Sequence, residues 1–277
     1  MGTRTVSGID SVKSGLAVTE YRPEGTYDAT VVALSSLGVS RRSWATAGPA
    51  LGRRHRCLAV DIPGHGFSEP APHFMTIADF AEALGAMLDA EGIRDAVLVG
   101  NSMGATICTE LAATRPDLVS CLAHVGSAVW ESEAARRNWL HSRSSLFCNP
   151  DGRPPEMTGE FVEAIFGSYD ADRHRMLRED QQRSGVRLGW AMWALYSYDT
   201  IAALRRLLMP VLAVFGENDP YREQTLPLLR RHVARLDEVM VAGGGHLLPV
   251  DRGPELADHI DTWLSTISAN ERTKETP

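Results

Sequence analysis

The stretch VLVGNSMGA, residues 97–105, decides the fold of this chain. Apolar residues lead into a single G-x-S-x-G motif with Ser102 at its centre, and a helical pattern over 105–115 follows. The glycines on both sides of the serine, Gly100 and Gly104, let a strand and a helix approach one another without a clash of Cβ atoms. The motif therefore predicts a buried strand, a sharp turn that presents the Ser102 hydroxyl, and a helix whose N-terminus favours negative charge beside it.

Short apolar runs rich in β-branched residues recur on both sides of this motif. Such runs are typical of strands that are buried on both faces of a parallel sheet. They cover residues 29–34, 57–60, 96–99, 119–125, 211–215 and 238–242, and a further edge strand is expected over 12–22. Helical patterns alternate with them at 77–90, 105–115 and 256–267. The chain is therefore predicted to be an α/β protein with a mostly parallel, doubly wound sheet.

One long segment, residues 131–208, lacks a strand pattern and is rich in aromatic and methionine side chains. We expect a helical cap over 131–208, inserted into an α/β core made of residues 1–130 and 209–268, and a flexible polar tail over 269–277. Most of the aromatic residues are expected to pack the cap onto the core, and about a third of them to line a pocket. The substrate-binding residues that we predict are Trp130, Trp190, Trp193 and Leu247.

A serine hydroxyl attacks only with the help of a base, and the base needs an acid that orients it. The strand predicted over 211–215 leads into Asp219, and the strand over 238–242 leads into three glycines and His246. Both residues thus follow the carboxyl ends of strands, where doubly wound sheets place their sites. The chain order of serine, acid and histidine is also the one typical of a G-x-S-x-G turn of this kind. We predict Ser102 as the nucleophile, His246 as the base and Asp219 as the orienting acid.

Other titratable residues fit these roles less well. His124 falls inside a predicted buried strand, where we expect a histidine that is satisfied within the core. His232 and His259 fall on helical patterns and are expected to face solvent. Glu217 lies two residues before Asp219, and Asp251 follows the His246 loop, so both remain alternative acids.

Composition restricts the partners of the protein. The chain has 277 residues and a net charge of −7 without a basic stripe, which argues against nucleic acids and anionic membranes. It has no run of 18 apolar residues and no apolar N-terminal segment, so we expect a cytoplasmic protein. It has no metal-binding or nucleotide-binding motif, so we expect no metal and no cofactor. The expected partner is a small-molecule substrate, and the sequence does not indicate an oligomeric state.

Over about residues 28–267 the chain resembles the capped α/β-hydrolases, a group of esterases, lactonases and C–C bond hydrolases. Besides the serine motif, the stretch DIPGHGFS, residues 61–68, is similar to the D-x-P-G-H-G-x-S loop that follows the family's fourth strand. The resemblance implies that Asp61 and His65 are structural and that Phe67 borders the pocket.

The resemblance also implies an oxyanion hole made of two backbone N–H groups. One belongs to Met103, the residue after the nucleophile, and the other to the loop after the third strand. This loop reads SSLGV, residues 35–39, where many members of the family carry His-Gly. With Trp44 downstream it is similar to the loop of 3-oxoadipate enol-lactonases, and that similarity assigns the second N–H to Leu37. Each well-placed donor of this kind contributes roughly 3–4 kcal/mol in the transition state.

The reaction class rests on the same resemblance. The Asn-Ser-Met-Gly sequence is similar to that of meta-cleavage-product C–C hydrolases, but those carry Trp after the catalytic His, where this chain has Leu247. Haloalkane dehalogenases and epoxide hydrolases need a carboxylate at the position of Ser102. The resemblance thus favours hydrolysis of a carboxylic ester or lactone of a small apolar or aromatic molecule through an acyl-enzyme. A C–C bond hydrolase, a thioesterase, a biosynthetic cyclase or lyase, and a non-catalytic binding protein remain alternatives.

Overall fold

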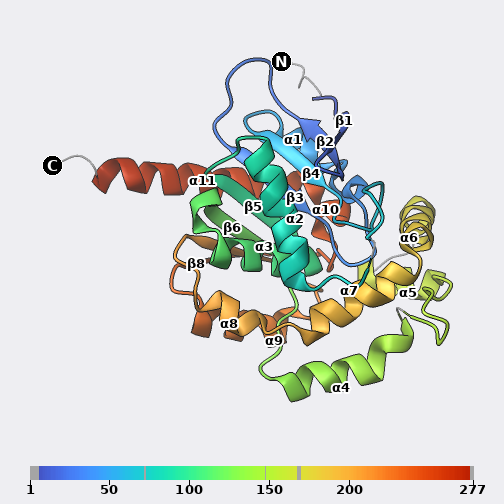
Figure 1. The fold of residues 1–277 in the computed structure, drawn as a ribbon. Helices are drawn as coiled ribbons and strands as arrows, with labels where there is room; N and C mark the ends of the chain where they lie inside the picture. Colours follow the sequence, from blue (N-terminus) through green and yellow to red (C-terminus); the bar gives the residue numbers. More distant parts are fainter. Residues whose placement is uncertain (1–5, 72, 147, 167–169, 275–277) are drawn as a thin grey trace.

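An eight-stranded sheet forms the centre of the computed structural model, which describes residues 6–71, 73–146, 148–166 and 170–274 (Figure 1). The strand order is β1-β2-β4-β3-β5-β6-β7-β8. β2 pairs with β1 and β4 in antiparallel fashion, and the other pairs are parallel. The strands are β1 (Ile9–Lys13), β2 (Leu16–Tyr21), β3 (Thr30–Leu34), β4 (Arg56–Val60), β5 (Ala96–Asn101), β6 (Val119–Val125), β7 (Val211–Gly216) and β8 (Leu236–Val241). The mostly parallel α/β sheet predicted from the sequence is confirmed.

The N-terminal edge of the sheet differs from the prediction. The sequence predicts one edge strand over 12–22, whereas the structure has a hairpin of β1 and β2. Ser14 and Gly15 lie between the two strands with φ angles of 48° and 78°, and two successive positive φ angles reverse a chain tightly. The prediction of a single strand is wrong because β1 lies half exposed at the edge and therefore lacks an apolar run.

Helices cover both faces of the sheet, because successive strand residues point to opposite faces. In β3, Val32 and Leu34 join the core beneath one layer of helices, and Val31 and Ala33 join the core beneath the other. Figure 1 shows α2 and α3 on one side of the strands and α11 on the other. The first layer contains α2 (Ile77–Ala90), α3 (Met103–Thr114), α8 (Thr200–Leu204) and α9 (Arg222–His232), and the second contains α1 (Ala47–Leu51) and α11 (Gly253–Lys274).

The C-terminal helix α11 extends beyond the predicted end at residue 267. Residues 269–274 of the predicted polar tail belong to this helix, and 275–277 lie outside the described residues. We call the sheet and the helices on its two faces the body. It also contains three short elements: η1 (Arg41–Trp44), η2 (Pro116–Leu118) and α10 (Leu248–Asp251).

Between β6 and β7 the chain forms what we call the helical insert, residues 133–197. Every regular element among its described residues is a helix: α4 (Glu133–Arg143), η3 (Ser144–Leu146), α5 (Gly159–Phe166), α6 (Ala171–Ser184) and α7 (Val186–Ser197). Side chains cap two of these helices, because Ser132 accepts a hydrogen bond from the N–H of Ala135 and Asp170 accepts one from Arg173. In Figure 1 the insert lies at the lower right, beside the sheet.

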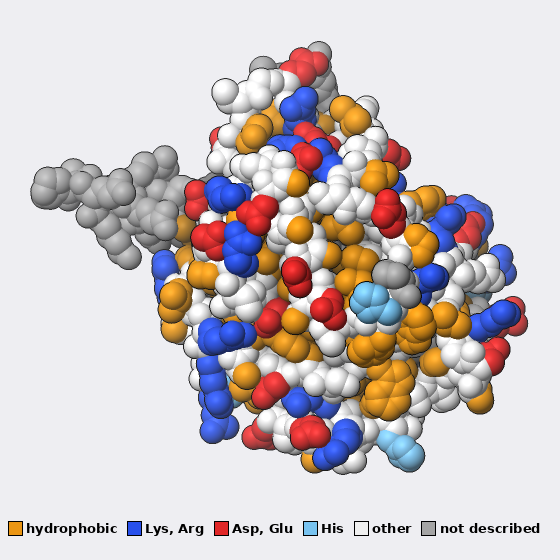
Figure 2. All heavy atoms as spheres, viewed as in Figure 1, with side chains coloured by type: hydrophobic (Ala, Val, Ile, Leu, Met, Phe, Trp, Pro, Cys, Tyr) orange, Lys and Arg blue, Asp and Glu red, His pale blue; other side chains and the backbone are white. Residues whose placement is uncertain are grey.

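The surface carries charges of both signs. Figure 2 shows acidic and basic side chains intermingled on the face viewed, with hydrophobic side chains between them. Among the described helices, none has both the length and the hydropathy that crossing a membrane requires.

Candidate active site

Ser102 occupies the turn between β5 and α3. Its backbone has φ 54° and ψ −115°, a left-handed conformation that is rare for a residue with a Cβ atom and costs about 1–3 kcal/mol. The Ser102 N–H donates to the carbonyl of Val125 in β6 at 2.9 Å, which holds the turn against the neighbouring strand. The hydroxyl does not cap α3. The side chain is only 8% exposed and lines a cavity.

The two glycines of the motif allow contacts that no other residue could make. A Cβ atom on Gly100 would lie 2.3 Å from the amide nitrogen of Ala105, and one on Gly104 would lie 2.7 Å from the carbonyl oxygen of Leu34. α3 therefore starts directly against the ends of β5 and β3. This contact places the N-terminus of α3 next to the loop that follows β3.

His246 and Asp219 lie beyond the ends of β8 and β7. His246 Nδ1 lies 3.1 Å from Asp219 Oδ2, and since a carboxylate only accepts, Nδ1 carries the proton. The other carboxylate oxygen accepts the N–H of Tyr221 at 2.9 Å, so the acid is held on both sides. Both side chains are buried, and the His246 ring lines the same cavity as Ser102. The structure thus brings the three predicted residues to one edge of the sheet.

Asn101 ties these loops together, and sequence reasoning missed it. Its buried side-chain amide donates at 3.0 Å to the carbonyl of Val125 and at 3.0 Å to the carbonyl of His246. Gly126 lies in the same contact, because a Cβ atom there would be 2.7 Å from the His246 carbonyl and 2.8 Å from Asp219 Oδ2. The sequence does contain a signal for Asn101, because it is a polar residue at the end of a fully buried strand and directly precedes the candidate nucleophile.

The two alternative acids, Asp251 and Glu217, form hydrogen bonds with groups other than the His246 ring. Asp251 accepts the N–H of Gly245 at 3.1 Å through one oxygen and receives the Arg173 guanidinium at 3.3 Å on the other. Glu217 accepts the N–H of Gly243 at 2.9 Å. Both carboxylates therefore brace the backbone of the glycine loop and do not orient the imidazole.

His124 and His65 are also buried. His124 Nε2 lies 2.6 Å from the Thr109 hydroxyl, whereas its Nδ1 has no partner among the described residues, so only half of the ring is satisfied. His65 Nδ1 lies 3.3 Å from the Pro63 carbonyl. Burial lowers the pKa of each ring to about 4, so both are neutral at pH 7.

The 61–68 loop has the structural role expected of Asp61 but not the pocket contact expected of Phe67. Asp61 pairs with the Arg41 guanidinium at 2.7 Å and accepts the N–H of Phe67 at 2.9 Å. Phe67 is 45% exposed and is not among the described residues that line the cavity. Its ring lies against the guanidinium of Arg183 at 4.1 Å from the ring centroid, so the pocket prediction for Phe67 is wrong.

The two residues predicted for the oxyanion hole, Met103 and Leu37, lie in two segments that pack against each other. Met103 is the first residue of α3, where N–H groups have no partner inside the helix. Leu37 lines the cavity, in the loop that packs against the start of α3. Gly38, with φ 71°, turns this loop, and the Ser35 hydroxyl donates to the Ser40 carbonyl at 2.9 Å.

A carboxylate of the helical insert holds the same loop. Asp180 in α6 is fully buried and accepts the Ser40 N–H at 2.8 Å and the Arg42 guanidinium at 2.5 Å. Glu179 beside it reaches the same guanidinium at 2.9 Å but is exposed. α6 is thus fixed to the body at the loop that carries Leu37.

We expect Asp180→Ala to lower the free energy of unfolding by about 2–3 kcal/mol, because it leaves a buried N–H and a guanidinium without their acceptor. This value is smaller than the roughly 3–5 kcal/mol typical of broken buried pairs, since Arg42 is one-third exposed and can turn to water. The matched control Glu179→Ala should cost less than about 0.5 kcal/mol. Urea unfolding measures both, and equal losses would show that Asp180 does not hold the loop.

The cavity above Ser102 has a volume of about 440 Å³ and walls from both the body and the insert. One wall is aromatic: the rings of Trp139 and Tyr196 stack with centroids 4.3 Å apart, and Tyr221 lies 4.9 Å from the His246 ring. Other lining residues, among them Leu177 and Met157, belong to one apolar cluster. The described lining residues are Ser36, Leu37, Val39, Ser102, Ala128, Trp139, Met157, Phe161, Leu177, Gln181, Leu195, Tyr196, Pro220, Tyr221, His246 and Leu247.

Of the four predicted substrate-binding residues, the structure places only Leu247 on the cavity wall. Trp130 lies behind the wall, with its ring 5.7 Å from that of Trp139. Trp190 and Trp193 are not among the described lining residues, and Trp193 is 53% exposed. The buried side chains of α7, Leu188, Ala191, Met192 and Leu195, recur at helical spacing on another face, so the predictions for the two α7 tryptophans are wrong. Trp139, in the mostly polar helix α4, lines the cavity instead.

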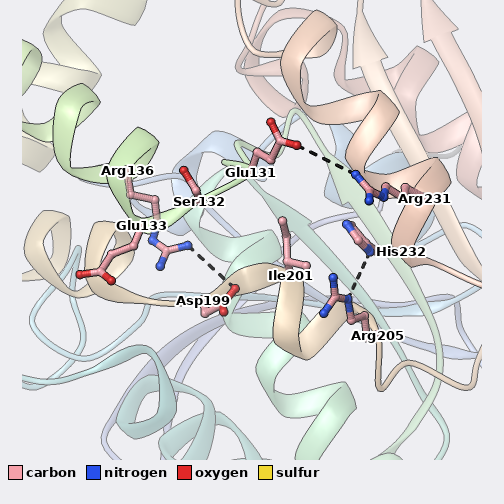
Figure 3. A pocket seen from close by; sticks show the side chains of 9 residues that line it. All are labelled: Glu131, Ser132, Glu133, Arg136, Asp199, Ile201, Arg205, Arg231 and His232. Carbon is pink, nitrogen blue, oxygen red and sulfur yellow. Dashed lines mark hydrogen bonds and ion pairs between the residues drawn. The ribbon is translucent and has the colours of Figure 1, made fainter.

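A second depression, of about 390 Å³, has a different character (Figure 3). Figure 3 shows charged side chains around it, including Arg136 facing Asp199 and Arg231 facing Glu131, at 3.9 and 4.0 Å. It contains none of the three candidate catalytic residues. Within the described residues, no group of three His, Cys, Asp or Glu side chains is placed to hold a metal ion.

Comparisons with known proteins identify sequences and structures similar to this chain. The chain is 19% identical over 237 residues to (E)-2-((N-methylformamido)methylene)succinate hydrolase of Acinetobacter baylyi, covering 85% of this chain and 90% of that protein. It is 29% identical over 238 residues to the putative carbamate hydrolase RutD of Pseudomonas savastanoi pv. phaseolicola, covering 79% and 87%. The enol-lactonase from Burkholderia xenovorans LB400 has a similar structure, with a TM-score of 0.71, 19% identity and coverage of 93% and 100%.

The family match extends over most of the chain. Residues 29–252 match the family described as alpha/beta hydrolase fold, a range that includes the Ser102 turn, the helical insert and both loops with Asp219 and His246. The chain therefore belongs to the alpha/beta-hydrolase fold family.

Proposed function

We propose that this alpha/beta hydrolase cleaves a carboxylic ester or lactone through an acyl-enzyme on Ser102. One observation carries the proposal: a serine with a left-handed backbone at the start of a helix lines the same cavity as a histidine whose Nδ1 is held by a buried aspartate. Those are the parts that an activated serine needs.

The proposed reaction has two steps. His246 Nε2 takes the proton of Ser102 while Oγ bonds to the acyl carbon and the carbonyl electrons move to oxygen. The N–H groups of Met103 and Leu37 stabilise that oxyanion, and its collapse expels the alcohol, which takes the proton from His246. Water then attacks the acyl carbon while His246 takes its proton, the bond from that carbon to Ser102 Oγ breaks, and Oγ takes the proton back from His246 as the acid leaves. Asp219 keeps the Nδ1 proton in place throughout.

Among the described residues, no hydrogen bond joins the Ser102 hydroxyl to the His246 ring. The proton transfer between these two side chains is therefore proposed from their positions in the same cavity. Such bonds often form only when substrate is bound.

We also propose that the helical insert acts as a cap that selects the substrate. The cavity volume of about 440 Å³ lies within the range of about 300–1,000 Å³ that is usual for small-molecule sites. Its walls are mostly apolar, and Trp139, Leu177 and Tyr196 all come from the insert. These properties favour a small apolar or aromatic substrate.

We expect Trp139→Ala to raise KM about fivefold to tenfold for an ester whose acyl group is aromatic, because the variant loses one face of the aromatic wall. The smaller acetyl ester of the same alcohol should change less than about threefold. Trp193→Ala is the matched control, since that side chain faces solvent, and both of its KM values should match those of the wild type. A larger effect at Trp193 than at Trp139 would rule out the aromatic wall as the selective element.

Product analysis in ¹⁸O-labelled water tests the reaction class. Hydrolysis of an ester or lactone incorporates one ¹⁸O atom into the product acid. We expect the acid that the wild-type protein produces to carry this label. Turnover without ¹⁸O in the product would overturn the proposal in favour of a cyclase or lyase. Binding without any turnover would favour a non-catalytic binding protein.

A further inference from the structure

The cavity contains no charged side chain among its described lining residues. The polar side-chain groups of these described residues are hydroxyls, the His246 ring, the Trp139 indole N–H and one amide, that of Gln181. A free carboxylate that entered would lose its hydration and find no cation in return, which is strongly unfavourable. An uncharged substrate has no such penalty.

Among the described lining residues, Gln181 alone has a side-chain amide, which offers both a donor and an acceptor. It lies in α6 and is 7% exposed. No hydrogen bond to its side-chain amide occurs within the described residues, yet the amide is not among the completely enclosed polar groups, so its atoms remain accessible. Gln181 and Met157 also line a neighbouring depression of about 320 Å³ in the insert.

The backbone that carries Gln181 is fixed. The preceding residue, Asp180, binds the Ser40 N–H and the Arg42 guanidinium. The Gln181 side chain packs beside Gly38, where a Cβ atom would lie 3.5 Å from its Cγ. The Gln181 Cγ atom therefore lies beside the loop that carries Leu37, and the residue lines the same cavity as Leu37.

We propose that the enzyme acts on uncharged esters or lactones and that Gln181 binds a neutral polar group of the substrate, a carbonyl or a hydroxyl. Such a group satisfies the amide, whereas a purely apolar chain leaves it unpaired. This inference rests on the proposed function and names the substrate class of the same site.

Three 4-nitrophenyl esters with acyl chains of equal length test the inference. The chains end in a methyl group, a methyl ketone or a carboxylate, and 4-nitrophenolate release gives kcat/KM for each. For the wild type we expect the ketone ester to exceed the methyl ester about fivefold to tenfold, and the carboxylate ester to fall at least about 100-fold below the methyl ester.

Gln181→Leu should abolish the preference for the ketone over the methyl ester. The comparison is a ratio measured on one preparation, so it does not depend on how much of the variant is folded. Gln182→Leu is the control, because Gln182 is the exposed neighbour in α6 and does not line the cavity; its ratios should equal those of the wild type.

The outcomes separate the inference from the proposed function. If the wild type hydrolyses the carboxylate ester as fast as the methyl ester, or if Gln181→Leu keeps the ketone preference, the inference fails while ester hydrolysis stands. If the folded wild type hydrolyses none of the three esters, the proposed function fails and the inference fails with it.

Discussion

Ser102→Ala is expected to lower kcat by about 10⁴–10⁶-fold, while the free energy of unfolding changes little. The large loss follows because no other group at the turn can form the acyl-enzyme, and the residual rate comes from binding and the oxyanion hole. Stability should hold, because the Ser102 hydroxyl does not cap α3 and the backbone contact to Val125 is made by the N–H, which alanine keeps.

A matched serine gives the control. Ser127 is buried near the end of β6, its hydroxyl has no partner among the described residues, and it does not line the cavity. Ser127→Ala should therefore leave kcat within about twofold and leave stability equal or slightly higher, since it removes an unsatisfied polar group. Steady-state kinetics with thermal melts measures both variants. If Ser102→Ala keeps more than about a tenth of the wild-type activity, the nucleophile is another residue.

Asp219→Asn is expected to lower kcat by about 10⁴-fold. The carboxylate accepts a hydrogen bond from His246 Nδ1, which lies 3.1 Å from Asp219 Oδ2, whereas an asparagine amide in its place can donate. The imidazole would then carry its proton on Nε2, where it cannot take the proton of Ser102. KM should change much less than kcat, because Asp219 does not line the cavity.

Asp251→Asn provides the comparison for the acid. Asp251 is also a buried carboxylate near His246, but it binds the Gly245 N–H and Arg173. The amide oxygen of asparagine can still accept the N–H, so we expect kcat to fall less than about tenfold. A greater loss at Asp251 than at Asp219 would reverse the assignment of the acid.

The sequence predicts well those features that depend on neighbouring residues. A buried parallel strand needs a continuous apolar run, so β3 to β7 are recognisable from short windows, and the run at 238–242 also indicates β8, which is a half-exposed edge strand. Ser102, Asp219 and His246 follow three of these strands, and the carboxyl ends of parallel strands meet at one edge. Their proximity therefore follows from the strand assignments together with the chain order.

The features that the sequence did not predict depend on packing between distant segments. The periodicity of α7 shows which residues share a face, but not whether that face or the opposite one meets the cavity, and this is why Trp193 was misplaced. Asp180 and Ser40 lie 140 residues apart, and no local pattern links a carboxylate of the insert to a loop of the body. The contact of Asn101 with the His246 carbonyl joins residues 145 apart and has the same origin.

Labelling with a serine-directed fluorophosphonate tests most directly whether Ser102 is an activated nucleophile. The probe phosphonylates a serine only when a base removes its proton and donors stabilise the oxyanion. We predict one equivalent of probe per folded chain, found by peptide mass spectrometry on Ser102, with no label in Ser102→Ala and much slower labelling in Asp219→Asn. A folded wild-type protein that takes up no probe, or takes it up on a different serine, would contradict the central claim.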